Sequence, residues 1–278
     1  MYSRSRKALG FGLSALGLMV AAAFGMPHKR VLRVCADPNN LPFSDSLGRG
    51  FENHLAQMLG RALGADVRYE WWTQRRGFVR NTLNAGKCDA VMSVPANFDM
   101  LLRTAPYYRS TYVFVTRATF QPPIESFDDP RLRTLRVGVQ MIGDDAANSP
   151  PANALARRGI TRNVRGFMVF GDYSKPEPQA PIVRAVADSE IDVAVVWGPT
   201  AGYFVRGSPV ALRMTPVTPQ IEQPFLPFVY DIAVGVRRGD STLRNDLNSA
   251  LERNRGGVTK LLDEFNVPRV SATMRGVK

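Results

Sequence analysis

Short apolar segments alternate with segments of helical periodicity along this chain, and the alternation constrains the fold more than any other feature. Strands that are connected through helices pair in parallel, and the helices cover the resulting sheet. The sequence is therefore expected to fold in the α/β class. The first run of this pattern predicts strands at 31–36, 65–71, 88–94 and 111–117 and helices at 50–63 and 77–85.

Prolines at positions 122, 123 and 130 interrupt the alternation before a second run begins. In that run Ser149, followed by two prolines, predicts a helix start, because serine is a good N-cap and proline suits the first turn. The segment DVAVVW is apolar without alternation, which is typical of a buried parallel strand. The second run predicts strands at 135–140, 164–170, 192–197 and 231–237 and helices at 149–158, 180–189, 241–254 and 257–265.

Two runs of strands and helices predict two lobes, and 278 residues suffice for two domains of ordinary size. The last two expected helices have no strands of their own, so we expect them to return to the first lobe. The expected organisation is a first lobe of residues 26–115 and 231–278, a second lobe of residues 116–230, and two strands that cross between them.

Residues 1–25 have the pattern of a secretory signal peptide. Three basic residues within the first seven positions precede an apolar stretch at 8–20, and small residues then allow cleavage after Ala23 or Gly25. No later stretch reaches the length of about 18 apolar residues that a membrane helix needs. We therefore expect a protein of the periplasm that is soluble once the signal peptide has been removed.

The chain carries 36 Lys and Arg residues against 24 Asp and Glu residues, a formal net charge of +12. The basic residues are spread from Arg30 to Arg275, and no nucleic-acid-binding motif accompanies them. We therefore expect a solvated basic surface and no nucleic-acid partner.

Cys35 and Cys88 are too few for a structural zinc site or a disulfide-rich scaffold. An exported protein can carry a disulfide, and the two expected strands are neighbours. Their expected register, however, separates the cysteines by several residues, and a disulfide needs Cα atoms within about 7 Å. The sequence alone leaves this disulfide open.

Residues for catalysis are scarce in this sequence. The two histidines are His28, beside the signal peptide, and His54, inside an expected helix. A serine or cysteine nucleophile would therefore have almost no imidazole base available. No zinc-protease, phosphate-loop, G-x-S-x-G or calcium-loop motif is present. We expect neither enzymatic activity nor a bound metal or cofactor.

Polar and aromatic residues gather at the expected carboxyl ends of strands, where parallel α/β sheets bind ligands. Aromatic rings with a few polar groups are typical of a recognition cleft. For single residues the alternatives are an Asx turn at Asn39 and Asn40 and a core position for Trp71 and one other tryptophan. The candidate residues for binding a ligand or a partner are Asp37, Asn39, Asn40, Phe43, Trp72, Arg75, Arg76, Asn97, Tyr107, Tyr108, Gln140, Asp144, Asp145 and Trp197.

Long motifs in the chain resemble known families. Type II periplasmic solute-binding proteins contain segments similar to LRVCADPNNLPFSDSLGRGFENHLA, CDAVMSV and APYYRSTYVFVTR. One subgroup, the J-type proteins encoded beside pyrroloquinoline-quinone (PQQ) methanol dehydrogenases, resembles WWTQRRGFVRNTLNAGKCDAVMSVPANFDM, VGVQMIGDDAANSPPANALARRGI and DVAVVWGPTAGYF. The resemblance covers nearly all of residues 31–268. It implies a bilobal type II periplasmic binding protein fold, with two mostly parallel sheets flanked by helices and a two-strand hinge.

The resemblance also implies a function without catalysis. J-type proteins are expected to act in the assembly, maturation or activation of the methanol dehydrogenase. The implied partner is the large subunit of this PQQ-dependent enzyme, and its c-type cytochrome is a second candidate. The alternative function is that of a receptor delivering a small polar solute, other than a standard amino acid, to an ABC transporter.

The chain departs from the amino-acid-binding relatives at the residues that would bind an amino acid. These relatives hold the ligand carboxylate with an arginine, whose position here falls between Asn97 and Leu101, and Arg103 is the only arginine nearby. Asp37 matches the acid of their first lobe, but Trp197 replaces the acid of their second lobe. Without the carboxylate–guanidinium pair, we expect no tight binding of standard amino acids.

Overall fold

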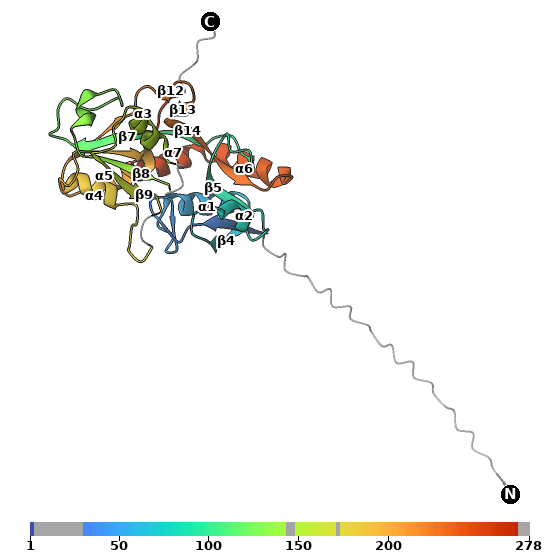
Figure 1. Cartoon of the computed structure of the whole chain (residues 1–278). Coiled ribbons are helices and arrows are strands. Elements are labelled where there is room, and N and C mark those ends of the chain that lie inside the picture. The colour runs from blue at the N-terminus through green and yellow to red at the C-terminus, as the bar shows by residue number, and fades with distance from the viewer. Residues whose placement is uncertain (3–29, 143–147, 171–172, 272–278) are drawn as a thin grey trace.

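The computed structural model describes residues 1–2, 30–142, 148–170 and 173–271 of the chain (Figure 1). The expected cleavage positions after Ala23 and Gly25 lie outside the described residues, as do the candidate site residues Asp144 and Asp145. Within the described part, no helix is both long and apolar enough to cross a membrane.

The first lobe is built on three parallel strands that are covered by a helix. Its elements are β1 (Arg30–Ala36), β2 (Asn39–Asn40), β3 (Ser44–Asp45), α1 (Phe51–Ala62), β4 (Ala65–Trp71), α2 (Phe78–Asn81), β5 (Ala90–Pro95), β6 (Leu102–Arg103) and the start of β7 (Tyr108–Arg117). β1 pairs in parallel with β4 on one side and with β5 on the other. Phe51, Leu55 and Leu59 recur at four-residue intervals, so α1 turns all three side chains into the core, where they are fully buried.

The second lobe repeats this arrangement around a second parallel sheet. Its elements are η1 (Pro130–Arg133), β8 (Val137–Met141), α3 (Pro150–Arg157), β9 (Val164–Met168), α4 (Pro181–Ala187), β10 (Val193–Trp197), α5 (Gly198–Arg206), β11 (Leu212–Pro216), β12 (Ile221–Glu222) and β13 (Leu226–Pro227). β8 pairs in parallel with both β9 and β10, and residues 193–196 are fully buried. The Ser149 hydroxyl accepts a hydrogen bond from the backbone N–H of Ala152 at the start of α3, so the predicted N-cap is confirmed.

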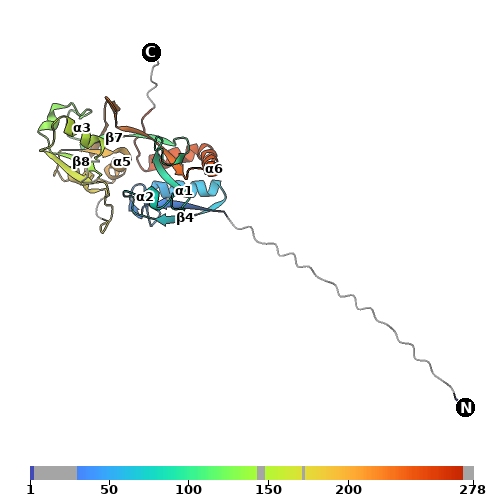
Figure 2. The same ribbon diagram turned by 45° about the vertical axis from the view of Figure 1, so that its right-hand side comes forward.

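Two strands cross between the lobes. β7 and β14 (Val229–Val236) pair with each other in antiparallel orientation, with Thr111 opposite Val229. β14 also pairs with β5 of the first lobe, and β7 also pairs with β10 of the second lobe. The strands therefore form one path in the order β4-β1-β5-β14-β7-β10-β8-β9. Figures 1 and 2 show the two groups of elements on either side of the crossing strands.

The chain after β14 packs on the first lobe. Helices α6 (Ser241–Arg253) and α7 (Arg255–Glu264) contact α1, and Leu247 and Leu262 share one core with Val34. Figure 2 shows the orange and red helices beside the blue helix α1. The C-terminal helices therefore contribute to the core of the first lobe.

Two elements differ from the sequence-based expectation. The helix expected at 77–85 is the single turn α2, because the backbone at Thr82 leaves helical geometry and the Thr82 hydroxyl donates a 2.7 Å hydrogen bond to the carbonyl of Phe78. Strand β11 was not expected, although its sequence LRMTP alternates apolar and polar residues over its first four positions, because the run is short and ends at a proline. It pairs with β7 and widens the sheet of the second lobe.

Cys35 and Cys88 form a disulfide, with Cα atoms 5.5 Å apart. The strand register places Val91, not Cys88, opposite Cys35. The chain bends at Asp89 before β5 begins, so Cys88 does not follow the strand register and can reach Cys35. The register argument from sequence could not resolve this pairing because it extended the strand through the bend.

Candidate functional site

A cavity of about 1020 Å³ lies between the two lobes, and we call it the cleft. Strands β7 and β14 contribute Tyr108, Tyr112 and Tyr230 to its lining. Gln140 and Trp197 enter it from the carboxyl ends of β8 and β10. The cleft therefore lies where parallel α/β sheets usually bind their ligands.

Half of the predicted binding residues reach the cleft, and they come from both lobes. Gln140 also fixes the wall of the second lobe, because its Oε1 atom accepts a 2.9 Å hydrogen bond from the backbone N–H of Trp197. Arg75 and Arg76 lie on the connection between β4 and α2, where both are exposed. The predicted residues that line the cleft are Asn40, Phe43, Arg75, Arg76, Tyr108, Gln140 and Trp197.

Asp37 and Asn39 do not line the cleft but join the lobes at its edge. The hydroxyl of Tyr173, from the second lobe, donates a hydrogen bond to the Asp37 carboxylate. The side-chain amide of Asn39 donates to the carbonyl of Lys175, at 2.9 Å. The Gln179 amide donates to Oδ1 of Asn40. We call these contacts of residues 173–179 with residues 37–40 the latch.

The Asp37 carboxylate accepts hydrogen bonds both from the latch and from its own lobe. The donors from its own lobe are the backbone N–H groups of Asn39, at 2.9 Å, and Gln74, at 2.6 Å. Burial and the neighbouring Asp37 carboxylate both raise the pKa of the Tyr173 hydroxyl, which therefore stays protonated and donates. The guanidinium group of Arg75 covers the Tyr173 ring, 5.2 Å from its centroid. Asp37, at 1% exposure, is thus enclosed by groups of the protein itself.

The remaining predicted residues within the described ranges lie away from the cleft lining. Tyr107 is directed to Ser93 and to the carbonyl of Met92, with oxygen distances of 2.9 and 3.1 Å. Trp72 is 37% exposed and packs under the ammonium group of Lys87, 4.6 Å from the ring centroid. Asn97 is exposed in the turn after β5.

Arg103, the nearest substitute for the carboxylate-binding arginine, serves its own loop. Its guanidinium group donates to the carbonyls of Phe98 and Leu101, the latter at 3.1 Å. It does not line the cleft. The sequence lacks the carboxylate-binding arginine of the amino-acid-binding relatives. In the structure Arg103 does not replace it, because its guanidinium group is hydrogen-bonded to backbone carbonyls.

Glu52, the second residue of α1, lines the cleft and was missed by the sequence analysis. Burial raises the pKa of its carboxyl group to about 7, and the negative charge of Asp37 acts in the same direction, although a hydrogen bond from Ser93 favours the ionised form. Among the described residues, no lysine or arginine lies within 4 Å of this carboxyl group. The sequence signal was an acid beside the buried Phe51, which was interpreted only as part of a helix.

Aromatic rings from the second lobe and the crossing strands form one wall of the cleft. Trp197 contacts Tyr112 with ring centroids 5.3 Å apart and Tyr230 with centroids 5.8 Å apart, both edge to face. Burial raises the pKa of the Tyr112 hydroxyl, which stays protonated. We call Tyr112, Trp197 and Tyr230 the aromatic wall. Sequence analysis singled out Trp197 but placed Tyr112 in an expected strand without further comment and did not single out Tyr230, which precedes the expected strand at 231–237.

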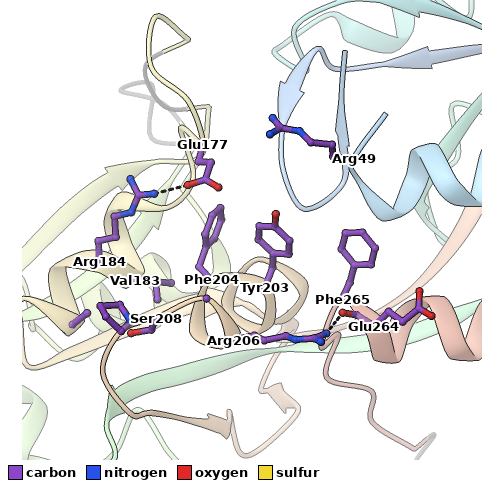
Figure 3. Close-up of a pocket in the computed structure, with 13 residues that line it drawn as sticks. Arg49, Glu177, Val183, Arg184, Tyr203, Phe204, Arg206, Ser208, Glu264 and Phe265 are labelled. Atoms are coloured by element: carbon purple, nitrogen blue, oxygen red, sulfur yellow. Dashed lines mark hydrogen bonds and ion pairs between the residues drawn. The ribbon is translucent and has the colours of Figure 1, made fainter. Parts of the chain in front are cut away.

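A second pocket of about 540 Å³ also involves both lobes (Figure 3). Figure 3 shows Arg184 directed to Glu177, with which it is paired, and Arg206 directed to the carbonyl of Glu264. Arg49, on the opposite side, pairs with Asp45 at 2.5 Å. The guanidinium groups of Arg49, Arg184 and Arg206 in this pocket therefore already have partners within the protein. Across the described ranges, no group of His, Cys, Asp and Glu side chains could hold a metal ion.

Comparisons with known proteins place the chain in a family. No protein-family model matches it. It is 32% identical to the protein MoxJ of Methylorubrum extorquens over 257 residues, which cover 89% of this chain and 84% of that protein. It is 30% identical to MoxJ of Paracoccus denitrificans over 278 residues, covering 95% of this chain and 96% of that protein.

A solved structure shows the same fold. The crystal structure of the periplasmic binding protein XoxJ from Methylobacterium extorquens AM1 matches with a TM-score of 0.71 at 32% identity. The match covers 87% of this chain and 100% of that chain. The chain therefore belongs to the MoxJ family of periplasmic binding proteins and has the bilobal type II fold that its motifs predict.

Proposed function

We propose that this protein is a non-catalytic periplasmic accessory factor for the assembly, maturation or activation of a PQQ-dependent methanol dehydrogenase. Its partner is the large subunit of that enzyme, and the c-type cytochrome is a second candidate. Family membership and the J-type motifs support this function. The observation that carries the proposal is the latch, because it occupies residues that a receptor for amino acids would leave free for its ligand.

The latch argues against an amino-acid receptor in a specific way. In amino-acid-binding relatives a second-lobe acid holds the ligand amine, and Trp197 replaces that acid here, whereas Asp37 matches their first-lobe acid. Here its carboxylate accepts hydrogen bonds from Tyr173, Asn39 and Gln74 instead. A ligand amine would have to displace these donors, and a buried acceptor that exchanges one donor for another gains little free energy.

Exposed side chains near the cleft favour a protein partner. Trp72 is 37% exposed and Met100 49% exposed. Met100 lines a shallow neighbouring pocket together with Arg75 and Arg76, which also line the cleft. Tryptophan and arginine are enriched among residues that dominate binding at protein interfaces. We call Trp72, Arg75, Arg76 and Met100 the rim and propose that the partner contacts it. We also propose that the basic charge of the protein speeds association with an acidic partner.

The proposal includes export and two lobes with stated boundaries. Residues 1–25 act as the signal peptide, residues 26–115 and 231–278 form the first lobe, and residues 116–230 form the second. N-terminal sequencing of the protein from a periplasmic fraction would begin after Ala23 or Gly25. A sequence that still begins at Met1 would contradict export with cleavage.

Binding to the purified methanol dehydrogenase tests the function. We expect the exported protein to bind the large subunit, and Trp72→Ala with Arg76→Ala to weaken binding at least tenfold, since hot-spot residues contribute about 2 kcal/mol or more. The matched controls are Phe225→Ala, an apolar residue that is 89% exposed, and Arg253→Ala on α6. Absence of binding by the unmutated protein would overturn the function. If the control variants lose as much binding affinity as the rim variants do, the rim is not the surface that binds the dehydrogenase.

The alternative function remains the receptor of an ABC transporter for a small polar solute other than a standard amino acid. The cleft volume of about 1020 Å³ favours it, because small-ligand sites have volumes of this order. Neighbouring genes for a permease and an ATPase would support transport, whereas neighbouring genes for a dehydrogenase and a cytochrome would support the accessory function.

A further inference from the structure

We propose that the cleft binds a primary alkylammonium group, with Glu52 as its counter-ion and the aromatic wall against its hydrocarbon part. The inference concerns the chemistry of the cleft and goes beyond the proposed function, because it specifies a ligand group that the function does not require. The ammonium group could belong to a free amine or to a lysine side chain of the partner protein.

The first argument is that Glu52 has no cationic partner among the described residues. Its side chain is partly buried at the cleft, and an acid that is partly withdrawn from water is normally paired with a cation, since desolvating an unpaired charge is costly. Among the described residues, no lysine or arginine lies within 4 Å of the Glu52 carboxyl group. A ligand that brings the missing positive charge into the cleft would remove this cost.

The second argument is the charge of the titratable groups that surround the Glu52 carboxyl group. The titratable groups that act on Glu52 are Asp37 at the latch, Tyr69 on β4, and Tyr107 and Tyr108 at the start of β7. All four are acids or phenols, so their lone pairs and negative charge favour a cation. Arg75 and Arg76 also line the cleft, but both side chains are exposed, and both also line the shallow neighbouring pocket that contains Met100. The positive groups are therefore at the opening and the acid is inside.

The third argument is a set of acceptors that suits three N–H donors. The Tyr108 hydroxyl is buried and has no hydrogen-bond partner of ordinary geometry among the described residues, although Tyr108 lines the cleft and is only 6% exposed. Ser93, beside Glu52, also lines the cleft. A primary ammonium group carries three donors and no acceptor, which matches a carboxylate and two hydroxyl oxygens.

The fourth argument is the apolar and aromatic part of the remaining lining, which lies on the crossing strands and at Trp197. Ile232 pairs with Tyr108 across the crossing strands, and Tyr230 lies two residues before it on β14. Tyr230 contacts Trp197, which contacts Tyr112. A hydrocarbon chain that leaves the ammonium group would therefore meet Ile232 and then the aromatic wall. This arrangement selects an amine with an apolar body over a small inorganic cation.

Calorimetry with n-hexylammonium and the neutral probe 1-hexanol tests the inference on the exported, disulfide-bonded protein. We expect n-hexylammonium to bind at pH 8 at least tenfold more tightly than 1-hexanol. Its affinity should fall about tenfold at pH 6, because the ionised fraction of a group with a pKa of about 7 falls by that factor. Glu52→Gln should weaken amine binding at least tenfold and remove the pH dependence. The control Glu252→Gln, on the exposed face of α6, should change neither.

Binding of 1-hexanol as tightly as n-hexylammonium would overturn the inference, as would a Glu52→Gln variant that keeps both the affinity and its pH dependence. The source of the ammonium group is then decided with the dehydrogenase. If n-hexylammonium competes with the dehydrogenase and Glu52→Gln weakens that complex, a lysine of the partner supplies the group. If the complex is unchanged, a free amine does. Amine binding is measured directly, so it can fail while dehydrogenase binding stands, and the reverse also holds.

Discussion

Replacing Glu52 by glutamine should stabilise the protein at alkaline pH and have little effect at acidic pH. The pKa of Glu52 is raised to about 7 in the folded protein, mainly by burial, whereas an unfolded chain has the ordinary value of 4.5. The folded state therefore keeps its proton to higher pH than the unfolded state does. The stability that protonation provides is fully present below pH 4.5 and is lost as the pH rises through about 7.

The magnitude follows from the two pKa values. A difference of this size corresponds to about 3 kcal/mol in the free energy of unfolding once both states are ionised. Part of the loss has already occurred at pH 5, and the Glu52 carboxyl group faces a cleft that water can enter. We therefore expect the stability of Glu52→Gln relative to the unmutated protein to rise by about 2 kcal/mol between pH 5 and pH 8.

Urea unfolding at pH 5, 6, 7 and 8, followed by circular dichroism, measures this difference. Groups other than Glu52 titrate in both proteins and cancel in the comparison. The matched control is Glu252→Gln, whose exposed side chain on α6 should give a difference that does not change with pH. A constant difference between Glu52→Gln and the unmutated protein across these pH values would refute the reasoning.

Three further predictions address other contacts. Replacing Cys35 and Cys88 by serine should lower the free energy of unfolding by about 4 kcal/mol, because the disulfide closes a loop with a sequence separation of 53. Urea unfolding of the serine variant and of the oxidised protein measures this difference. Tyr173→Phe removes the hydrogen bond to Asp37, so small-angle scattering should show a larger radius of gyration if the latch holds the lobes together. Standard amino acids should bind no more tightly than the micromolar range in calorimetry, because Asp37 is occupied and Arg103 is directed to backbone carbonyls.

Each of these predictions has a contrary outcome. Serine variants as stable as the oxidised protein would mean that the disulfide does not restrict the unfolded chain. A Tyr173→Phe protein with an unchanged radius would show that the remaining latch contacts suffice. Sub-micromolar affinity for any standard amino acid would show that the departures at residues 97–103 and at Trp197 were misinterpreted.

Periodicity was sufficient to predict most of the regular structure. Apolar runs and helical spacing located β1, β4, β10 and α1 to within a few residues, because these elements bury one face or both faces. The cap at Ser149 was predictable because its chemistry is local. Strand β11 was missed, although Leu212 and Met214 pack against the core, because the alternating run is only four residues long before Pro216.

The cleft was predictable in position but not in detail. Strand ends indicated Asn40, Gln140 and Trp197, because parallel sheets collect such residues at one edge. Glu52 and Tyr230 were missed, since a helix residue and a strand residue show no local sign that they border a cavity between lobes. The latch was also missed, because the contact of Tyr173 with Asp37 joins segments separated by 136 residues and follows no periodic pattern.

The edge contacts of Trp197 provide the molecule with an intrinsic optical reporter. Its indole ring rests against Tyr112 on one crossing strand and Tyr230 on the other, whereas Trp71 stacks on Tyr69 within β4. A rotation of the second lobe about the crossing strands would change the surroundings of Trp197 and leave those of Trp71 as they are. The emission spectrum of a Trp71→Phe, Trp72→Phe protein would therefore follow opening and closing in real time, without an attached dye.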